Sequence, residues 1–388
     1  FQPGVEHGLW QWNGYSLGLM ICEDMWGHEP SELLLNACKT KNSALDAIIN
    51  CSASPFHVGK LNQRLDRAKE ISAIFQCPFI YVNRVGAEDE ILFDGQSFAF
   101  NPSKGQTILG MFKPEIGEAA IIKNTVPFSA TQGIPTQSNT WNQLFKADLV
   151  ELDNSFHPSL RAWSDQECGE VFAALQFGLQ EYARKCGMKN FLVALSGGID
   201  SGLVLALAKL SLSPQQQIEA IFMPGLHSTE LSMKLATEIC QNLNMQLKHL
   251  PIKFLHTINK NLFREHIGSD VTGVADENLQ SRIRGTLLYT RSNKTGAMVI
   301  NTSNKSEIAV GYSTQYGDSV GALSLIGDLF KSQVYQLCNY INQKYGQIIP
   351  KQMIERAPTA ELRPNQTDEQ SLLPYNMLDP LLECILSY

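Results

Sequence analysis

The sequence has no Cys-x-x-Cys pair, and its nine cysteines are an odd number scattered over 388 residues. Closely spaced pairs are typical of structural zinc sites, and an even set of cysteines is typical of a disulfide framework. The pattern found here argues against both kinds of site. Free thiols persist in a reducing compartment, so we expect a cytoplasmic protein.

The chain also lacks an excess of basic residues and a long apolar run. Its net charge is −7, whereas nucleic acid binds to a basic surface, so we expect no nucleic-acid partner. No apolar stretch approaches the roughly 20 residues that a membrane-spanning helix needs, so we expect no membrane association. The first residue is Phe1 rather than Met, and no leader of the secretory kind follows it. We expect the chain to be a fragment that begins within a domain.

What remains is the composition of a globular protein, with 44% apolar and 18% charged residues. A length of 388 residues suggests two domains or more. Residues 125–158 carry Thr, Gln, Ser, Asn and Pro in excess with weak periodicity, which is typical of a boundary. We predict a first domain over 1–130, a linker over 131–162 and a second domain over 163–388.

The most informative stretch is 191–207, which we expect to fold as a buried strand, a tight loop and a helix. Residues 191–195 form a short apolar run, and 196–198 read Ser-Gly-Gly. Asp200 and Ser201 would open the helix. Glycines let a backbone approach a ligand closely, and the N–H groups at a helix start favour an anion. A strand-to-helix turn with ordinary capping is the alternative interpretation.

Asp200 carries the wrong charge for a phosphate ligand, but it would fit Mg²⁺ that bridges phosphate oxygens. The loop is not a Walker A loop, because no Gly-Lys-Ser/Thr follows it. The complete string Ser-Gly-Gly-Ile-Asp-Ser after an apolar strand is far more specific than two glycines alone. It resembles the pyrophosphate loop of ATP pyrophosphatases, enzymes that cut ATP between its α and β phosphates.

The first half of the chain alternates apolar runs with amphipathic stretches. We expect strands over 15–21, 44–50, 78–83 and 95–102, helices over 29–41 and 64–75, an acidic connection over 88–94, and a hairpin-like pair of 97–101 with 117–123. Cys22 follows the first strand directly. A Cys at such a place is most often packing material. The acidic residues that come next, Glu23 and Asp24, indicate instead that this thiol faces a cleft.

This half resembles the later part of a nitrilase-type amidase, in particular the glutaminase domain of glutamine-dependent NAD⁺ synthetases. The strings that carry the resemblance are LMICEDMW (19–26), INCSASPFHVGK (49–60) and YVNRVGAEDEILFDGQSF (81–98). The resemblance implies part of an αββα sandwich, with Cys22 as the nucleophile and with Ser54 and Lys60 holding glutamine. A thiolate that attacks the side-chain amide yields a thioester and ammonia.

The resemblance also implies a catalytic triad in the chain order Glu, Lys, Cys. Only 21 residues precede Cys22, and Glu6 has no matching context. We therefore expect that the Glu and the Lys are missing from this chain and that it hydrolyses glutamine poorly. Glu23 and Asp24 are expected to be structural residues or to lie behind the site, rather than to act as the base.

The second half alternates strands and helices, which predicts a doubly wound parallel sheet of the Rossmann-like type. We expect strands over 191–195, 218–223, 247–252 and 297–301, and helices over 163–186, 230–243, from 276, from Lys331 and over 378–387. Residues 311–328 should form a mobile loop and 357–375 a flexible flap. Ligands of such a sheet bind at the carboxyl ends of its strands.

Polar residues follow the fourth of these strands, in the string Asn-Thr-Ser-Asn-Lys-Ser-Glu (301–307). One interpretation is a capping box that starts at Ser303. The other is a ligand site, because Glu307 and Asp200 would follow neighbouring strands and two carboxylates there would share Mg²⁺. The residues alone leave the two interpretations equally open.

The strings of this half resemble the synthetase domain of NAD⁺ synthetases, which belongs to the adenine nucleotide alpha hydrolase class. They are SGGIDS (196–201), ENLQSRIR (277–284), NTSNKSE (301–307), VGYSTQYGD (310–318), GDLFKSQVY (327–335) and APTAELRPNQTDEQSLLPY (357–375). The resemblance implies ATP contacts from Ala194, Leu195, Ser196, Gly197, Gly198, Ile199, Asp200, Ser201, Thr302, Lys331 and Thr359. It implies Asn278 and Glu307 as contacts to deamido-NAD⁺, and Asp200 and Glu307 as ligands of Mg²⁺.

Together the two resemblances imply ATP-dependent amidation of deamido-NAD⁺ to NAD⁺, with ammonia taken from glutamine and with AMP and pyrophosphate released. The expected partners are these small molecules and further copies of the chain, because family members assemble as dimers or larger. Another amide-transfer pyrophosphatase, of the GMP or asparagine synthetase type, is an alternative, although those enzymes use different glutaminase folds. A catalytically silent subunit is a further alternative.

Overall fold

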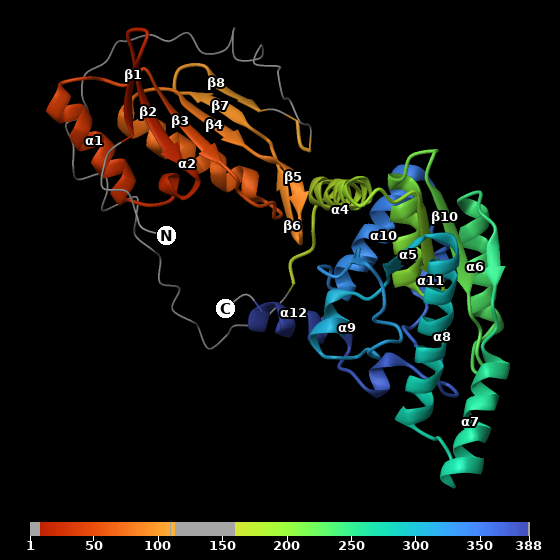
Figure 1. Ribbon diagram of the computed structural model, residues 1–388. Coiled ribbons are helices and arrows are strands. Elements are labelled where there is room, and N and C mark those ends of the chain that lie inside the picture. The colour runs from red at the N-terminus through yellow and green to blue at the C-terminus, as the bar shows by residue number, and fades with distance from the viewer. Residues whose placement is uncertain (1–7, 109, 113–159, 387–388) are drawn as a thin grey trace. The chain divides into compact units, whose positions relative to one another are not determined.

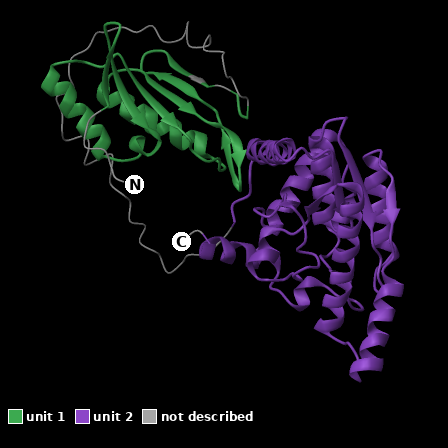
Figure 2. Cartoon of the chain, in the orientation of Figure 1, with its two compact units in different colours: residues 1–154 green, residues 155–388 purple. Residues whose placement is uncertain are grey.

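The computed structural model describes residues 8–108, 110–112 and 160–386 (Figure 1). The chain divides into two compact units, 1–154 and 155–388 (Figure 2). Their boundary falls inside the predicted linker, most of which lies outside the described residues, as does the predicted strand 117–123. Each unit is built around a sheet of its own. Among the described residues, no helix combines the length and the apolar character that crossing a membrane requires.

Unit 1 contains a six-stranded sheet in the order β1-β2-β3-β4-β7-β8. Its strands are β1 Leu9–Trp12, β2 Tyr15–Ile21, β3 Ala47–Ser52, β4 Phe79–Asn83, β7 Phe98–Asn101 and β8 Gly105–Ile108. The three central strands are parallel, and the outer ones pair antiparallel. Helices α1 Glu29–Lys41 and α2 Lys60–Phe75 cover one face, where Leu34 and Ile71 pack against strand residues such as Ile48 and Phe79.

The other face of this sheet is also apolar. Side chains alternate between the two faces along a strand, and this face carries Tyr15, Leu19, Ile21 and Val82, which are 39% to 71% exposed. A sheet with helices on one face and apolar side chains on the other is what one half of an αββα sandwich presents. The predicted fold class of this unit is confirmed by the similarities given below.

The predicted acidic connection over 88–94 is wrong. Its residues belong to a separate hairpin of β5 Val85–Glu88 and β6 Ile91–Asp94. Asp89 adopts a positive φ of 52°, which a two-residue hairpin turn requires and Asp tolerates. β7 pairs with the nearby β8.

Unit 2 contains a five-stranded, fully parallel sheet in the order β11-β10-β9-β12-β13. Its strands are β9 Asn190–Ala194, β10 Gln217–Phe222, β11 Leu247–His249, β12 Met298–Asn301 and β13 Leu323–Ser324. The chain runs outward from β9 to β11 and then crosses to β12 on the other side of β9. The doubly wound sheet is as predicted, and its order reverses between β9 and β12. The loops that follow these two strands therefore flank the crevice in which such folds bind ligands.

The helices of unit 2 surround this sheet (Figure 1). They are α4 Asp165–Lys185, α5 Ile199–Ser211, α6 Glu230–Asn242, α7 Lys253–Ile267, α8 Val274–Thr295, α9 Lys305–Ala309, α10 Lys331–Tyr345, α11 Lys351–Glu355 and α12 Tyr375–Leu386. A capping box starts α4, because Ser164 accepts from the N–H of Glu167 and the Glu167 carboxylate accepts from the N–H of Ser164. The sequence did not lead us to expect α7, α11 or β13.

Helix α5 fixes the loop that precedes it. Its sequence is apolar all round, which is typical of a buried helix. Leu203, Leu205 and Leu207 are fully buried, and the helix packs against both α4 and α10. Because α5 is held on several sides, the 196–198 turn at its start occupies a fixed place at the carboxyl end of β9.

Candidate active site

The 196–198 turn contains one residue, Gly197, in a conformation that only glycine adopts easily. Gly197 lies at φ +85°, and a Cβ there would come 2.4 Å from the backbone oxygen of Ser232 at the start of α6. Ser196 Oγ lies 3.1 Å from Ser201 Oγ and accepts from the N–H of Gly198 at 3.2 Å. Hydrogen bonds of Ser196 and Ser201 thus stabilise the turn, and Gly197 packs closely on α6.

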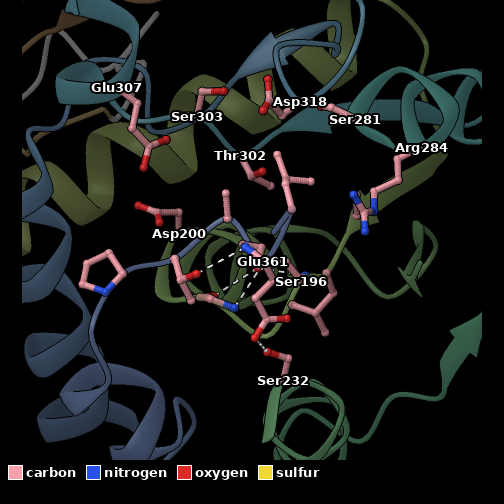
Figure 3. A pocket seen from close by; sticks show the side chains of 18 of the residues that line it. Ser196, Asp200, Ser232, Ser281, Arg284, Thr302, Ser303, Glu307, Asp318 and Glu361 are labelled. Carbon is pink, nitrogen blue, oxygen red and sulfur yellow. Dashed lines mark hydrogen bonds between the residues drawn. The ribbon is translucent and has the colours of Figure 1, made fainter. Parts of the chain in front are cut away.

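A cavity of about 260 Å³ opens at the ends of β9, β10 and β12 (Figure 3). In Figure 3, Asp200 and Glu307 lie at one end of the cavity and Arg284 lies at the other. Ten of the eleven predicted ATP contacts line the cavity, namely Ala194, Leu195, Ser196, Gly198, Ile199, Asp200, Ser201, Thr302, Lys331 and Thr359. The remaining one, Gly197, packs on α6 instead. The fold thus brings together residues that lie up to 165 positions apart, from Ala194 to Thr359.

Lys331 connects the two predicted metal ligands. Its ammonium lies 2.5 Å from Asp200 Oδ2 and 3.2 Å from Glu307 Oε1, and its side chain is 2% exposed. Burial lowers the pKa of Lys331, but the neighbouring carboxylates of Asp200 and Glu307 outweigh it and hold that pKa well above its ordinary value. Burial raises the pKa of Glu307 to about 7, although Lys331 acts in the opposite direction. This end of the cavity is therefore a charged cluster shielded from water.

The donor set at this end fits a hard divalent cation. Mg²⁺ is commonly held by one or two carboxylates together with phosphate oxygens of a substrate. Asp200 and Glu307 supply carboxylates from the first turns of α5 and α9, and both reach the Lys331 ammonium. Asp200 Oδ1 also accepts from Asn304 Nδ2 at 2.9 Å, which fixes the orientation of that carboxylate. The two carboxylates remain the predicted Mg²⁺ ligands.

The alternative interpretation of 301–307 as a capping box from Ser303 is wrong. Asn304 is the cap of α9, because its Oδ1 accepts from the N–H of Glu307 at 3.0 Å. The N–H of Ser303 bonds to Asn301 Oδ1 instead. The carboxylate of Glu307 is therefore free of capping and reaches Lys331.

Asn301 ties the end of β12 to the predicted mobile loop. Its Nδ2 donates to the backbone oxygens of Asp318 at 2.9 Å and of Val320 at 3.1 Å, and the side chain is 3% exposed. Asp318 in turn lines the cavity. Residues 311–328 thus form a wall of the cavity and also contribute β13 to the sheet.

Several cavity residues were not identified from the sequence. Ser281, Arg284 and Leu288 line it from one face of α8, at a spacing of three and four residues. That spacing, which starts within the string ENLQSRIR (277–284) and continues to Leu288, is the pattern that would have pointed to them. Arg284 donates from Nε to the Met223 backbone oxygen at 2.9 Å, and burial lowers its pKa to about 10.

Glu361 is a further residue that the sequence did not single out. Its carboxylate accepts from Thr229 Oγ1 at 2.8 Å, from Ser232 Oγ at 2.7 Å and from Arg356 Nη2 at 2.7 Å. Its N–H donates to Thr359 Oγ1 at 3.2 Å. Glu361 therefore attaches the predicted flap 357–375, with Thr359 on it, to the start of α6.

Asn278, a predicted contact to deamido-NAD⁺, lies near the start of α8. Its Oδ1 accepts from Thr314 Oγ1 at 2.7 Å. Asn278 is not among the described residues that line the cavity. Glu307, the other predicted contact, does line it. Asn278 thus remains a prediction for a ligand that extends beyond the cavity itself.

In unit 1, the predicted glutamine-site residues follow neighbouring parallel strands. Cys22 comes directly after β2 and Ser54 comes two residues after β3, and these strands run in register with Ile21 opposite Cys51. Cys22 has a positive φ of 47°, which is uncommon outside glycine and is often found at functional sites. The Asp24 carboxylate accepts from the N–H of Ile21 at 2.8 Å, which is the structural role expected of it.

Lys60 and Ser54 are both held by neighbours. The Lys60 ammonium lies 4.5 Å from the centre of the Trp26 ring. Trp26 directly follows the helical turn Cys22–Met25. Ser54 Oγ accepts from Arg64 Nη2 at 3.0 Å, and its hydroxyl can still donate to a ligand. Arg64 is fully buried and forms a two-bond ion pair with Asp94, at 2.9 and 3.0 Å.

Comparison with known proteins places this geometry in a family. A family model described as NAD synthase matches residues 171–387. The glutamine-dependent NAD(+) synthetase of Aquifex aeolicus is 34% identical over 98% of this chain and 67% of the relative. The chain belongs to the glutamine-dependent NAD(+) synthetase family. The glutamine-dependent NAD(+) synthetase of Thermotoga maritima is also 34% identical to it, over 98% of this chain and 66% of the relative. The chain spans about two thirds of the length of these curated relatives.

Solved structures of this family agree in fold. A glutamine-dependent NAD⁺ synthetase from Acinetobacter baumannii, in complex with ADP, has a TM-score of 0.73 and 26% identity, covering 99% of this chain and 69% of that chain. One from Cytophaga hutchinsonii has a TM-score of 0.65 at 19% identity, which shows the fold alone. The predicted family and fold class are confirmed, and membership supports ATP as a substrate.

Proposed function

We propose that the chain catalyses the ATP-dependent amidation of deamido-NAD⁺ to NAD⁺, with release of AMP and pyrophosphate. The observation that carries this proposal is the meeting of the Ser-Gly-Gly-Ile-Asp-Ser loop with Lys331 and Glu307 at the switch point of the sheet. A helix start, a buried ammonium and two carboxylates form a site for a polyphosphate with its divalent cation. Family membership supports the choice of acceptor.

The reaction has two steps. A carboxylate oxygen of deamido-NAD⁺ attacks the α-phosphorus of ATP, and the bond to the bridging oxygen breaks so that pyrophosphate leaves. Ammonia then attacks the carbonyl carbon of the adenylate, loses a proton, and AMP leaves with the bonding electron pair. In this scheme the N–H groups at the start of α5 and the Lys331 ammonium bind the phosphates and stabilise the charge of the leaving pyrophosphate. Asp200 and Glu307 would hold Mg²⁺, which would supply further positive charge.

We also propose that unit 1 supplies ammonia, at the low rate expected of a site without the Glu and the Lys of the triad. The Cys22 thiolate attacks the side-chain amide carbon of glutamine, ammonia leaves, and water later cleaves the thioester to glutamate. Ser54 and Lys60 hold the polar groups of glutamine. The position of Cys22 at the end of a parallel strand, with a strained backbone, supports this role.

We further propose that the chain assembles with copies of itself. Phe254, Ile258 and Leu262 follow one another at four-residue spacing on α7, and they are 48% to 79% exposed. An apolar stripe of this kind is typical of a surface that another chain covers. Sedimentation of the wild type and of Ile258→Glu tests this, and a monomeric wild type would contradict it.

The test of function is NAD⁺ formation from deamido-NAD⁺, ATP and Mg²⁺, with ammonia or glutamine as nitrogen source. We expect formation with ammonia, unchanged in Cys22→Ala and abolished in Asp200→Asn. The rate of NAD⁺ formation with glutamine should fall to background in Cys22→Ala. Cys186→Ala, which changes another solvent-accessible cysteine, is the matched control. A folded chain that forms no NAD⁺ with ammonia would refute the proposal.

A further inference from the structure

Asp379 is a fully buried carboxylate that the proposed chemistry does not use. It lies on α12 and is 0% exposed. Burying a carboxylate is strongly unfavourable unless hydrogen bonds compensate for the lost water. Asp379 has two such bonds, because Oδ1 accepts from Ser306 Oγ at 2.6 Å and Oδ2 accepts from the N–H of Ser332 at 2.8 Å. Both partners are adjacent in sequence to residues of the site.

These bonds complete the start of α10. The residue at its cap position is Phe330, which has no side-chain oxygen to accept from the first N–H groups of the helix. Ser306 Oγ accepts from the N–H of Lys331 at 2.9 Å, and Asp379 accepts from the N–H of Ser332. The cap of α10 is thus supplied by α9 and α12. A negative charge at a helix start is also favourable.

The same arrangement links Lys331 to Glu307. Ser306 precedes Glu307 on α9, and its hydroxyl donates to Asp379 while accepting from Lys331. Helix α12 packs against both α9 and α10 (Figure 1). One turn before Asp379, on the same face of α12, the Tyr375 ring centre lies 5.3 Å from the Lys331 ammonium. One buried carboxylate therefore holds the backbones that carry both charged groups.

We propose that Asp379 is a positioning residue, which sets the relative placement of Lys331 and Glu307 against the phosphates. This inference rests on the proposed function. Misplacement of a reacting group by about 1 Å costs about 10²-fold in rate. The charge of the leaving pyrophosphate develops only as the bond breaks, so the placement of Lys331 matters more for that step than for ATP binding. Loss of Asp379 should therefore lower kcat and leave KM for ATP nearly unchanged.

The experiment compares four variants of the full chain in ammonia-dependent NAD⁺ formation. We expect Asp379→Ala to lower kcat by about 10- to 100-fold, with KM for ATP within about threefold. Asp379→Asn should keep most of the activity, because its Oδ1 can accept from Ser332 and its Nδ2 can donate to Ser306 Oγ. Glu383→Gln changes an exposed carboxylate of the same helix. Val171→Ala lowers stability through α4, none of whose residues lines the cavity. Both controls should keep kcat.

An unchanged kcat in Asp379→Ala, or an equal loss in Val171→Ala, would overturn the inference. A second measurement separates this outcome from failure of the proposed function. Titration calorimetry with inorganic pyrophosphate and Mg²⁺ measures the affinity of the site for the leaving group without turnover. A wild type that makes no NAD⁺ would refute the function, yet pyrophosphate affinity at least about tenfold weaker in Asp379→Ala than in Val171→Ala would still support the positioning role. Equal affinities would overturn it.

Discussion

The glycine at position 197 should be indispensable to the fold of the loop, and its neighbour Gly198 should not. Gly197 lies at φ +85°, where an L residue costs roughly 1–2 kcal/mol. A Cβ there would also come within 2.4 Å, 2.8 Å and 2.9 Å of three backbone atoms of Ser232. Backbone cannot rotate away, so a further cost of about 1–3 kcal/mol follows from overpacking. Together, Gly197→Ala should destabilise unit 2 by about 2–5 kcal/mol.

Gly198→Ala is the matched control. Gly198 has an ordinary φ of −85°, and its added Cβ would meet only the movable Ser196 Oγ, at 3.2 Å. Its cost should stay within about 1 kcal/mol. Calorimetric melting of the full chain measures both variants, and Gly197→Ala should lower the melting temperature of unit 2 by roughly 4–20 °C. Equal melting temperatures for the two variants would refute the close packing of the loop on α6.

Three further predictions concern buried charges. Lys331→Met leaves the Asp200 and Glu307 carboxylates without their cation, so the free energy of unfolding in urea should fall by about 3–5 kcal/mol and ammonia-dependent kcat by about 10²- to 10³-fold. An active variant would contradict the proposed role. Arg64→Met should cost unit 1 about 3–5 kcal/mol in the same measurement, because Asp94 loses its buried partner, whereas Arg64→Met with Asp94→Leu should recover most of that loss. Equal stability of the single and double variants would count against the pair. The pKa of Glu307 is about 7 in the fold against 4.5 ordinarily, so its contribution to stability is complete below about pH 4.5 and is lost as pH rises through about 7. The free energy of unfolding in urea, measured against pH in metal-free buffer, should show this loss in the wild type and not in Glu307→Gln. Parallel pH profiles of the two proteins would contradict the raised pKa of Glu307.

The sheets and most helices were predictable because their patterns are local. Apolar runs such as 191–195 and the capping box at Ser164 show in a few consecutive residues. Of the missed elements, β13 has only two residues, too few for a periodic pattern. Helix α7 begins at Lys253 without a side-chain cap from Ile252, and it was missed although its apolar residues recur every four positions. The hairpin over 85–94 depends on Asp89 adopting a positive φ, which the acidic character of that stretch obscured.

Only the site residues that belong to local sequence motifs were predictable. The loop 196–201 carries glycines and an Asp at fixed spacing, and that pattern is specific. Glu361 and Asp379 owe their roles to partners 129 and 73 residues away, respectively. No local periodicity encodes such a pairing, because the fold creates it by bringing α6, α9 and α12 to the same crevice. Lys331 was identified by resemblance, but its position between two carboxylates follows only from the structure.

The most direct test of the account is the identity of the products formed from ATP. Phosphorus NMR of the full chain with ATP, Mg²⁺, deamido-NAD⁺ and ammonia resolves AMP with pyrophosphate from ADP with phosphate. We predict AMP, pyrophosphate and NAD⁺ in equal amounts, with no ATP consumed when deamido-NAD⁺ is left out. ADP and phosphate as products, or ATP cleavage without NAD⁺, would contradict the assignment of the 196–201 loop as a pyrophosphate site.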